Sequence, residues 1–180
     1  NIFQPTIVRA ALSDTHFLIS IVCREEFPDT IQAPGKTLWR EDNAEVFIGP
    51  DRFGYLQLML SPRGKINAVR GRTGGRGSRK IDMPDGIEHT TSIEKDLWRS
   101  EISIPVSAIL SVAGAPEDCV PDVYPWVIQI TRNRPARPKL GQKQQVSVLS
   151  VTRSFTSHCP LRFADLQLVH ASESPVPSPS

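Results

Sequence analysis

The sequence predicts an all-β protein, an antiparallel β-sandwich of the jelly-roll kind with about ten strands. Short segments rich in β-branched and aromatic residues recur along the chain, turn residues separate most of them, and apolar and polar residues alternate within them. One segment, residues 106–112, has apolar spacing that also suits a turn or two of helix, which Gly114 and Pro116 would end. The 180 residues are enough for one such domain with a sizeable core.

Ten segments have the composition of strands. In chain order they are residues 6–12, 16–24, 44–48, 55–61, 66–70, 90–93, 98–104, 126–131, 146–151 and 162–169. Residues 13–14, 50–51, 61–64 and 84–86 combine Ser, Asp, Pro and Gly, and these residues favour hairpins or crossings between sheets. Strands this short, joined by turns, favour two stacked antiparallel sheets.

Composition and charge narrow the class of protein. The 21 basic and 19 acidic residues leave a formal charge of +2, which does not indicate a nucleic-acid or membrane partner. No apolar run approaches the roughly 20 residues that span a bilayer, and no basic-then-apolar leader opens the chain. We expect one domain over residues 1–170, a Pro/Ser-rich linker or tail over 171–180, and a segment of a secreted, extracellular or periplasmic protein.

Cysteine and histidine do not indicate a metal site. The four histidines and three cysteines are scattered without the spacing of a zinc site. Cys23 alternates with apolar residues and is expected in the core. Cys119 and Cys159 fall in expected loops, where a disulfide could form in an oxidising compartment.

A polar stripe is the main candidate for a binding site. In a strand, alternate side chains share a face, so Glu45, Gln57, Glu101 and Gln129 each lie opposite the apolar residues of their own strands. If these strands are neighbours, the four side chains converge on one sheet surface, where arginines are candidates to accompany them. These arginines are Arg9, Arg99, Arg132 and Arg134. The plainer alternative is a solvent-facing side of a sheet that is buried on one face.

Trp39 precedes the Glu45 strand and adds an apolar platform. An indole ring matches the apolar face of a pyranose, and a carboxylate accepts hydrogen bonds from its hydroxyl rim. Trp39 and Glu45 therefore suit a sugar, although a half-buried core tryptophan with a solvent-facing acid is the alternative interpretation.

The order of these features resembles the family 9 carbohydrate-binding modules, within the broader DOMON-type group of sugar- and haem-binding sandwich domains. The matching segments are residues 8–10, 17–19, 39–48 and 55–57, then 97–105, 126–132 and 160–168. The resemblance covers nearly the whole chain, except that a first strand and a tryptophan-containing segment expected at the start are missing.

The resemblance implies a β-sandwich that binds the end of a glycan chain in a cleft, does no chemistry, and often holds structural calcium. Trp39 would form one wall of an aromatic clamp, and Glu45 and Gln57 match positions that bind sugar hydroxyls. The chain departs from the family at Met59 and Ser61, which replace a basic residue and an amide, and at Ser157, which replaces the second clamp tryptophan. Three further residues complete the predicted site, namely Arg132 for a polar contact and Phe155 or His158 to close the cleft. Calcium candidates are Asp14, Asp42 and Asp51, from the resemblance alone, and no cofactor is expected to be required.

Two acid-free basic runs, within residues 63–80 and 132–143, suggest that the glycan is anionic. Guanidinium groups bind carboxylate and sulfate in a forked geometry. The alternative is that both runs are solvated hairpin loops. Nucleic acid is disfavoured because the first run lacks the interleaved aromatic residues that stack on bases.

Three other functions are alternatives to a non-catalytic saccharide-binding module of a glycan-active protein. Glu45 and Glu101 could form a glycosidase pair, but no second signal supports hydrolase chemistry. A haem-binding electron-transfer domain could use Met59 and His158 as axial ligands. A structural or assembly domain would self-associate through its edge strands or basic loops.

Overall fold

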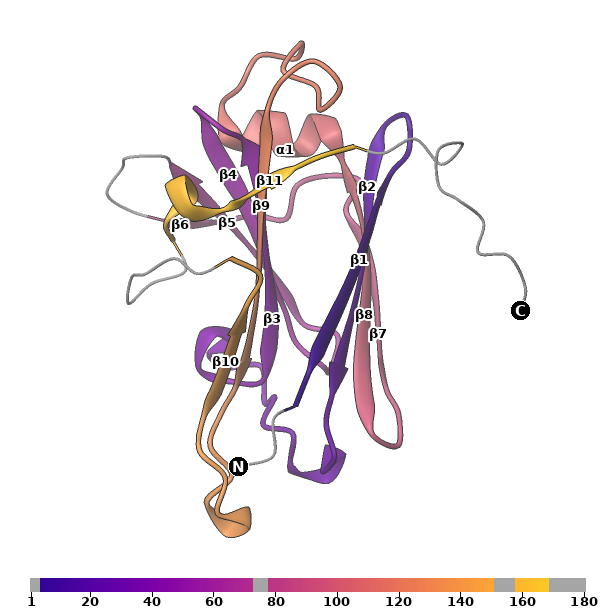
Figure 1. The fold of residues 1–180 in the computed structure, drawn as a ribbon, viewed down its shortest axis with the longest axis vertical. Helices are drawn as coiled ribbons and strands as arrows, with labels where there is room; N and C mark the ends of the chain where they lie inside the picture. The colour runs from indigo at the N-terminus through magenta and orange to yellow at the C-terminus, as the bar shows by residue number, and fades with distance from the viewer. Residues whose placement is uncertain (1–3, 73–77, 151–157, 169–180) are drawn as a thin grey trace, which may run out of the picture.

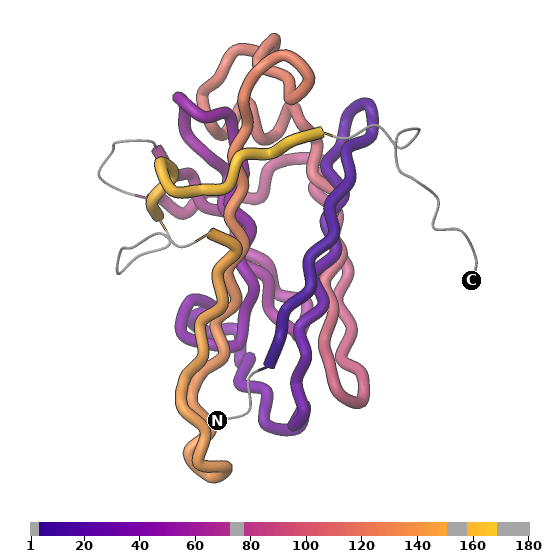
Figure 2. Tube along the Cα trace, viewed as in Figure 1, coloured from indigo at the N-terminus to yellow at the C-terminus, as the bar shows by residue number. Residues whose placement is uncertain are grey.

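Two antiparallel sheets pack face to face, with one short helix across one end of the sandwich (Figures 1 and 2). The structure is a computed structural model that describes residues 4–72, 78–150 and 158–168. The predicted all-β antiparallel sandwich is therefore confirmed.

The smaller sheet has four strands in the order β1 (Thr6–Leu12), β2 (His16–Arg24), β8 (Leu97–Pro105) and β7 (Glu88–Ile93). The β1–β2 turn is held by Ser13, whose backbone N–H donates to the His16 carbonyl at 2.9 Å and whose Oγ accepts from the His16 N–H at 3.1 Å. The strand bounds 6–12 and 16–24 agree with the sequence prediction, because runs of β-branched and aromatic residues flank a Ser-Asp turn.

The larger sheet has the order β10 (Gln145–Val148), β9 (Trp126–Arg134), β3 (Asn43–Pro50), β4 (Gly54–Leu60), β5 (Ile66–Arg72) and β6 (Arg79–Ile81). Strand β11 (Ala164–Leu166) also pairs with β9, along residues 126–128, while β10 pairs with residues 131–134 of the same strand. Every segment predicted as a strand overlaps one of these strands, and among the described residues only the three-residue β6 was missed. Single-turn 3₁₀ helices lie at Pro28–Thr30 (η1), Leu38–Arg40 (η2), Pro138–Leu140 (η3) and Pro160–Arg162 (η4).

The core lies between the sheets and is closed at one end by helix α1 (Val106–Ala113). Alternate residues of each strand enter it, among them Ile21 of β2 and Leu58 of β4, and Phe17 packs on Trp126 with ring centroids 5.3 Å apart. Cys23 is fully buried there, as expected. Helix α1 ends at Gly114, whose φ of 72° is a left-handed conformation that glycine adopts without steric cost.

The other end of the sandwich holds a buried cluster of charged side chains. Arg134 of β9 binds Glu25 with two hydrogen bonds of 2.7 and 2.9 Å, and Arg137 reaches both carboxylate oxygens of Asp42 at 2.8 and 2.7 Å. Arg132 donates to backbone carbonyls, including that of Arg24 at 2.7 Å. Burial opposes ionisation of Glu25, but the hydrogen bonds and charge of Arg134 outweigh it and hold the pKa of Glu25 below its ordinary value.

This cluster corrects one expectation from the sequence. The arginines of the basic run 132–143 are not in a solvated loop, because Arg132, Arg134 and Arg137 are each at most 3% exposed. Their acidic partners, Glu25 and Asp42, come from distant parts of the chain, so the run only looks acid-free along the sequence.

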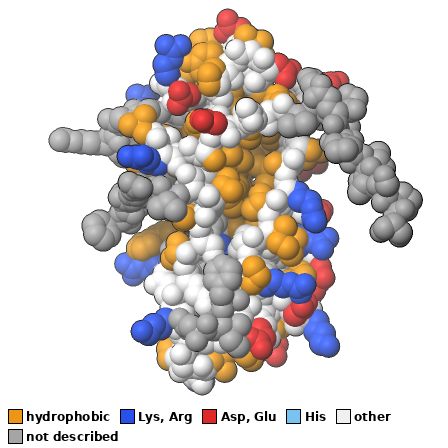
Figure 3. Space-filling view, in the orientation of Figure 1, with side chains coloured by type: hydrophobic (Ala, Val, Ile, Leu, Met, Phe, Trp, Pro, Cys, Tyr) orange, Lys and Arg blue, Asp and Glu red, His pale blue; other side chains and the backbone are white. Residues whose placement is uncertain are grey.

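The sandwich is open along the side formed by β1 and by β9 with β10. Figure 3 shows apolar side chains in the opening between the two sheets. A cavity of about 270 Å³ lies at this side, with Val8, Ile130 and Leu149 among its lining residues.

The three cysteines are free, so the disulfide that the sequence allowed between Cys119 and Cys159 is not formed. In the part of the chain that the structure describes, no helix is both long and apolar enough to span a bilayer.

Candidate functional site

The outer face of the larger sheet carries the first part of the candidate site. Strand register places Glu45 of β3 directly opposite Thr131 of β9 and Met59 of β4, and Gln57 opposite Phe47. Gln57 Nε2 donates to Glu45 Oε2 at 3.1 Å, so the two predicted ligand-binding residues are in contact. The other amide atom, Gln57 Oε1, is buried and accepts no hydrogen bond from the described residues. A ligand would therefore meet the pair at the Glu45 carboxylate, which is partly exposed.

Glu45 lies in a poorly solvated environment. Burial raises its pKa above the ordinary value of 4.5, although hydrogen bonds from Gln57 and Thr131 act in the opposite direction. Its carboxylate has acceptor capacity beyond these two bonds, since an ionised carboxylate offers about four lone-pair sites. Glu45 can thus accept hydrogen bonds from sugar hydroxyls, most effectively when it is ionised.

Trp39 is presented beside this patch by the 3₁₀ helix η2. Leu38 is 2% exposed and packs with Met59 and Val69 on the outer face, whereas the next side chain, Trp39, is 58% exposed. Because Met59 is the cross-strand neighbour of Glu45, the anchor of η2 lies next to the polar patch. The Arg40 guanidinium stacks over the Trp39 ring at 4.3 Å from its centroid, which leaves the opposite ring face for a ligand.

The loop before η2 is organised around one carboxylate that the sequence reasoning did not single out. Glu41 accepts hydrogen bonds from the backbone N–H groups of Gly35, Lys36 and Thr37 at 2.8, 2.9 and 2.7 Å. Burial alone would raise the pKa of Glu41, but these three bonds outweigh it and lower the pKa. The sequence does contain a signal for this role of Glu41, namely a carboxylate that follows a Gly-containing loop, because consecutive backbone N–H groups in such a loop bind anions.

An aromatic cluster lies on the same sheet face, on the other side of Gln57. It consists of Phe47, Tyr55, Val127 and Phe163, and the predicted site residue His158 packs against it. His158 Nδ1 and the Tyr55 hydroxyl are 2.8 Å apart, and burial lowers the pKa of His158. The Tyr55 ring lies over Gly71, where an added Cβ would come within 1.9 Å of Tyr55 Cζ. Tyr55 therefore has a fixed position from which it orients His158.

Three other predicted residues, Arg132, Glu101 and Gln129, are not available at this patch. Arg132 lies on the core face of β9, in the charge cluster described above, and Glu101 lies on the outer face of the other sheet. Gln129 is on the correct face but is used to hold Ser150, donating to its carbonyl at 2.6 Å and accepting from its N–H at 2.9 Å. Phe155 lies outside the described residues.

Two of the haem and calcium candidates, Met59 and Asp42, make other contacts in the structure. Met59 is 9% exposed and packs between Leu38 and Val69. Asp42 is paired with Arg137 and accepts from the Gln32 N–H at 2.7 Å, so a cation at Asp42 would lie against a guanidinium group. Within the described ranges, no group of three or more His, Cys, Asp or Glu side chains is arranged to hold a metal ion.

Comparisons with known proteins agree with this fold. No protein-family model matches the sequence, and no curated protein is significantly similar to it. Among solved structures, a family 9 carbohydrate-binding module from Caldicellulosiruptor kristjanssonii bound to glucose superposes with a TM-score of 0.64 at 12% identity, over 97% of this chain and 81% of that one. The same kind of module bound to cellotriose gives 0.64 at 12% identity, over 98% and 80% of the two chains.

A candidate carbohydrate-binding protein from Bacteroides uniformis gives a TM-score of 0.67 at 14% identity, over 90% of this chain and 77% of that one. Identities this low establish a common fold only. The resemblance to family 9 modules that the sequence motifs indicated is thus confirmed at the level of the fold.

Proposed function

We propose that this domain is a non-catalytic carbohydrate-binding module, with its site on the outer face of the larger sheet. The observation that carries the proposal is the exposed indole of Trp39, held by η2 beside the hydrogen-bonded pair Glu45 and Gln57. A sugar ring stacks on the free face of Trp39 while its hydroxyl groups bind the Glu45 carboxylate, which Gln57 holds in place. The similar structures from C. kristjanssonii hold glucose and cellotriose, which makes a neutral glucan the first ligand to test.

His158 forms part of the same proposal. It lies at the aromatic cluster, on the face that carries Gln57, and its ring is fixed by Tyr55. We assign it to the far side of the binding surface from Trp39, where it borders the bound ligand. Arg132 has no part in this surface, because its guanidinium is committed to backbone carbonyls in the interior.

A finer proposal is that the preferred glycan is acidic. Exposed cationic side chains surround the Trp39 loop, with Lys36 before it, Arg40 stacked on the ring, and Lys65 donating to the Gly35 carbonyl. The acids within this loop region, Glu41 and Asp42, are already engaged by backbone N–H groups and by Arg137. The three cations Lys36, Arg40 and Lys65 outnumber the two carboxylates without a cationic partner, Glu41 and Glu45, so a uronate stacked on Trp39 would meet a net positive field. The same proposal places the module in a secreted protein that acts on or attaches to polysaccharide.

Titration calorimetry with cellotriose and trigalacturonate tests both levels of the proposal. We expect both sugars to bind, with trigalacturonate the tighter ligand at low salt and the difference shrinking as salt is added. Arg40→Gln should remove most of the preference and leave cellotriose binding in place. If neither sugar binds, the saccharide site is refuted. If both bind with equal affinity, only the acidic preference is refuted.

A further inference from the structure

The outer face of the smaller sheet, opposite to the proposed saccharide site, carries several exposed apolar residues among its polar ones. Five of its outward positions are Ile7 and Ala11 of β1, Leu18 and Val22 of β2, and Leu97 of β8. Ile7 and Leu18 are 47% and 46% exposed. Solvated faces of antiparallel sheets normally carry polar residues, so a face of this kind indicates an interaction surface.

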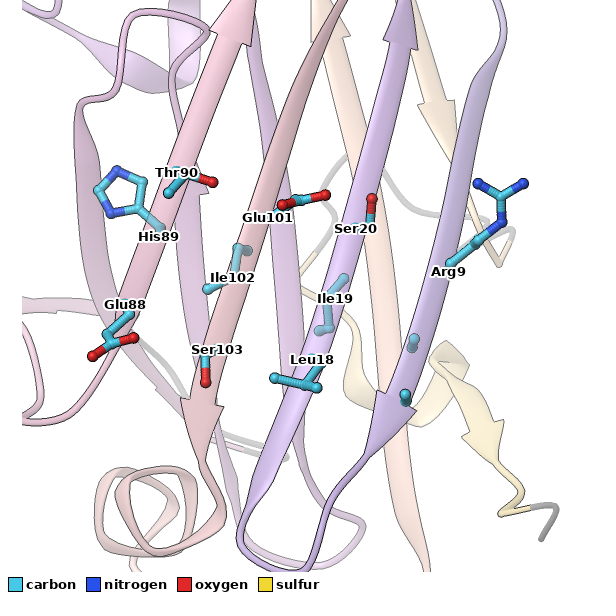
Figure 4. A pocket seen from close by; sticks show the side chains of 12 residues that line it. Arg9, Leu18, Ile19, Ser20, Glu88, His89, Thr90, Glu101, Ile102 and Ser103 are labelled. Carbon is cyan, nitrogen blue, oxygen red and sulfur yellow. The ribbon is translucent and has the colours of Figure 1, made fainter. Parts of the chain in front are cut away.

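One row across this face has charges of opposite sign on opposite sides of β2, while another outward cation, Arg99 of β8, lies one row away beside Val22. Register places Arg9 of β1, Ser20 of β2 and Glu101 of β8 in one row across the sheet. Figure 4 shows this row, with Arg9 and Glu101 on either side of the short Ser20 side chain. In the described part of the chain neither Arg9 nor Glu101 forms an ion pair, and both are exposed. The row is therefore a dipole centred on β2.

The same face is hollowed next to Leu18. A trough of about 690 Å³ crosses all four strands, and its floor is made of small side chains that include Ala11, Ser20 and Ser103. Leu18 projects at one end of the trough, in the row that also holds Ala11 and Ser103. Each copy of the domain thus carries a projecting leucine beside small residues that leave space for another leucine.

We propose that this face binds the same face of a second copy of the chain. A two-fold axis parallel to β2, lying between the two copies, places Arg9 of each copy over Glu101 of the other. The axis also brings the two Leu18 side chains together above the small residues of the trough. The contact is isologous, and it uses sheet-on-sheet packing at a spacing of about 10 Å, as inside the sandwich.

A second copy fits this face better than a saccharide does. The lining of the trough contains no Trp, Tyr or Phe on which a sugar could stack. An isolated surface ion pair contributes little, but two symmetric pairs beside a buried apolar stripe specify the register of an interface. The dimer would be four sheets thick and would carry its two proposed saccharide sites on opposite outer surfaces, so it would link separate glycan chains.

Sedimentation equilibrium with charge exchange tests the interface. The wild-type chain should form a species of twice its 20.0 kDa mass. Arg9→Glu and Glu101→Arg should each weaken dimerisation by about tenfold or more, and the double exchange should restore it to within about threefold of wild type. Leu18→Ser should also weaken it. Lys139→Glu on η3, an exposed site away from this sheet, makes the same charge change as Arg9→Glu and should have no effect.

The outcomes separate this inference from the proposed saccharide site. Trp39→Ala should dimerise like wild type even though it binds sugar poorly. A chain that stays monomeric at about 1 mM, single exchanges without effect, or a double exchange that fails to restore association would each overturn the interface. A further result would overturn the interface. If Trp39→Ala stayed monomeric and still bound cellotriose, and if adding Leu18→Ser abolished that binding, the trough would be a saccharide site.

Discussion

Replacing Trp39 with alanine is the most direct perturbation of the proposed site. A tryptophan side chain presents about 250 Å² of surface, and Trp39 is 58% exposed, so about 145 Å² is accessible. Arg40 occupies one face of the ring, and a stacked sugar would cover the other face, about 70 Å². At roughly 25 cal/mol per Å², this contact contributes about 1.8 kcal/mol, which is a loss of roughly 20-fold in affinity.

Calorimetric titration with cellotriose measures this loss, and a urea melt of the same variant measures its stability. Because the side chain is mostly exposed, the free energy of unfolding should change by less than about 0.5 kcal/mol. Trp39→Phe should retain part of the affinity, and Leu140→Ala, which removes an exposed apolar side chain from η3, should retain all of it. Undiminished affinity in Trp39→Ala would show that the ligand does not stack on this indole.

Four further perturbations follow from the structure. Burial raises the pKa of Glu45, so saccharide affinity should be constant at neutral pH and should begin to fall at a pH above the ordinary carboxyl value of 4.5 as the pH is lowered. The Glu45→Gln variant should lack this fall. An identical pH profile in the two proteins would contradict the assignment of Glu45 to the site. Glu41→Gln should weaken cellotriose binding by about fivefold and increase acrylamide quenching of tryptophan fluorescence. The reason is that a neutral amide holds the three backbone N–H groups of the Trp39 loop less strongly than a carboxylate does. Unchanged binding would show that the loop does not need the charge of Glu41. Arg134→Leu leaves Glu25 buried without its two-bond partner and should cost about 3–5 kcal/mol in a urea melt, against little change for Lys139→Leu. Gly71→Ala should destabilise the fold by about 1–3 kcal/mol, because the new methyl group would occupy the position of the Tyr55 ring; an unaltered melt would mean that the ring can move.

The contrast between Arg132 and Glu45 shows why part of the site could be predicted. Both were chosen for their chemistry, but alternation along β9 puts Arg132 on the same face as Ile128 and Ile130, which are core residues. The alternation in β9 therefore indicates that the Arg132 side chain points inward, which the expected sugar contact of Arg132 did not take into account. Glu45 alternates with Val46 and Ile48 and lies outward, as predicted.

Glu101 shows what the pattern could not reveal. Its outward position on β8 was predicted correctly, but β8 pairs with β2 and β7 in the smaller sheet, so Glu101 faces away from Glu45 and Gln57. Alternation tells which residues share a face of one strand. It carries no information on which strands, far apart along the chain, become neighbours.

The sequence by itself determined the strands, their inner and outer faces, the helix that stops at Gly114, and a tryptophan ahead of an acidic strand, because each depends on residues close together in the chain. The tertiary structure decided which sheet each strand joins, the pairing of Arg134 with Glu25 across 109 positions, the exposure of Trp39 on η2, and the alignment of Arg9 with Glu101 across β2. These features depend on long-range strand pairing, whose free energy comes from burying whole sheet faces and is not encoded in any short stretch of residues.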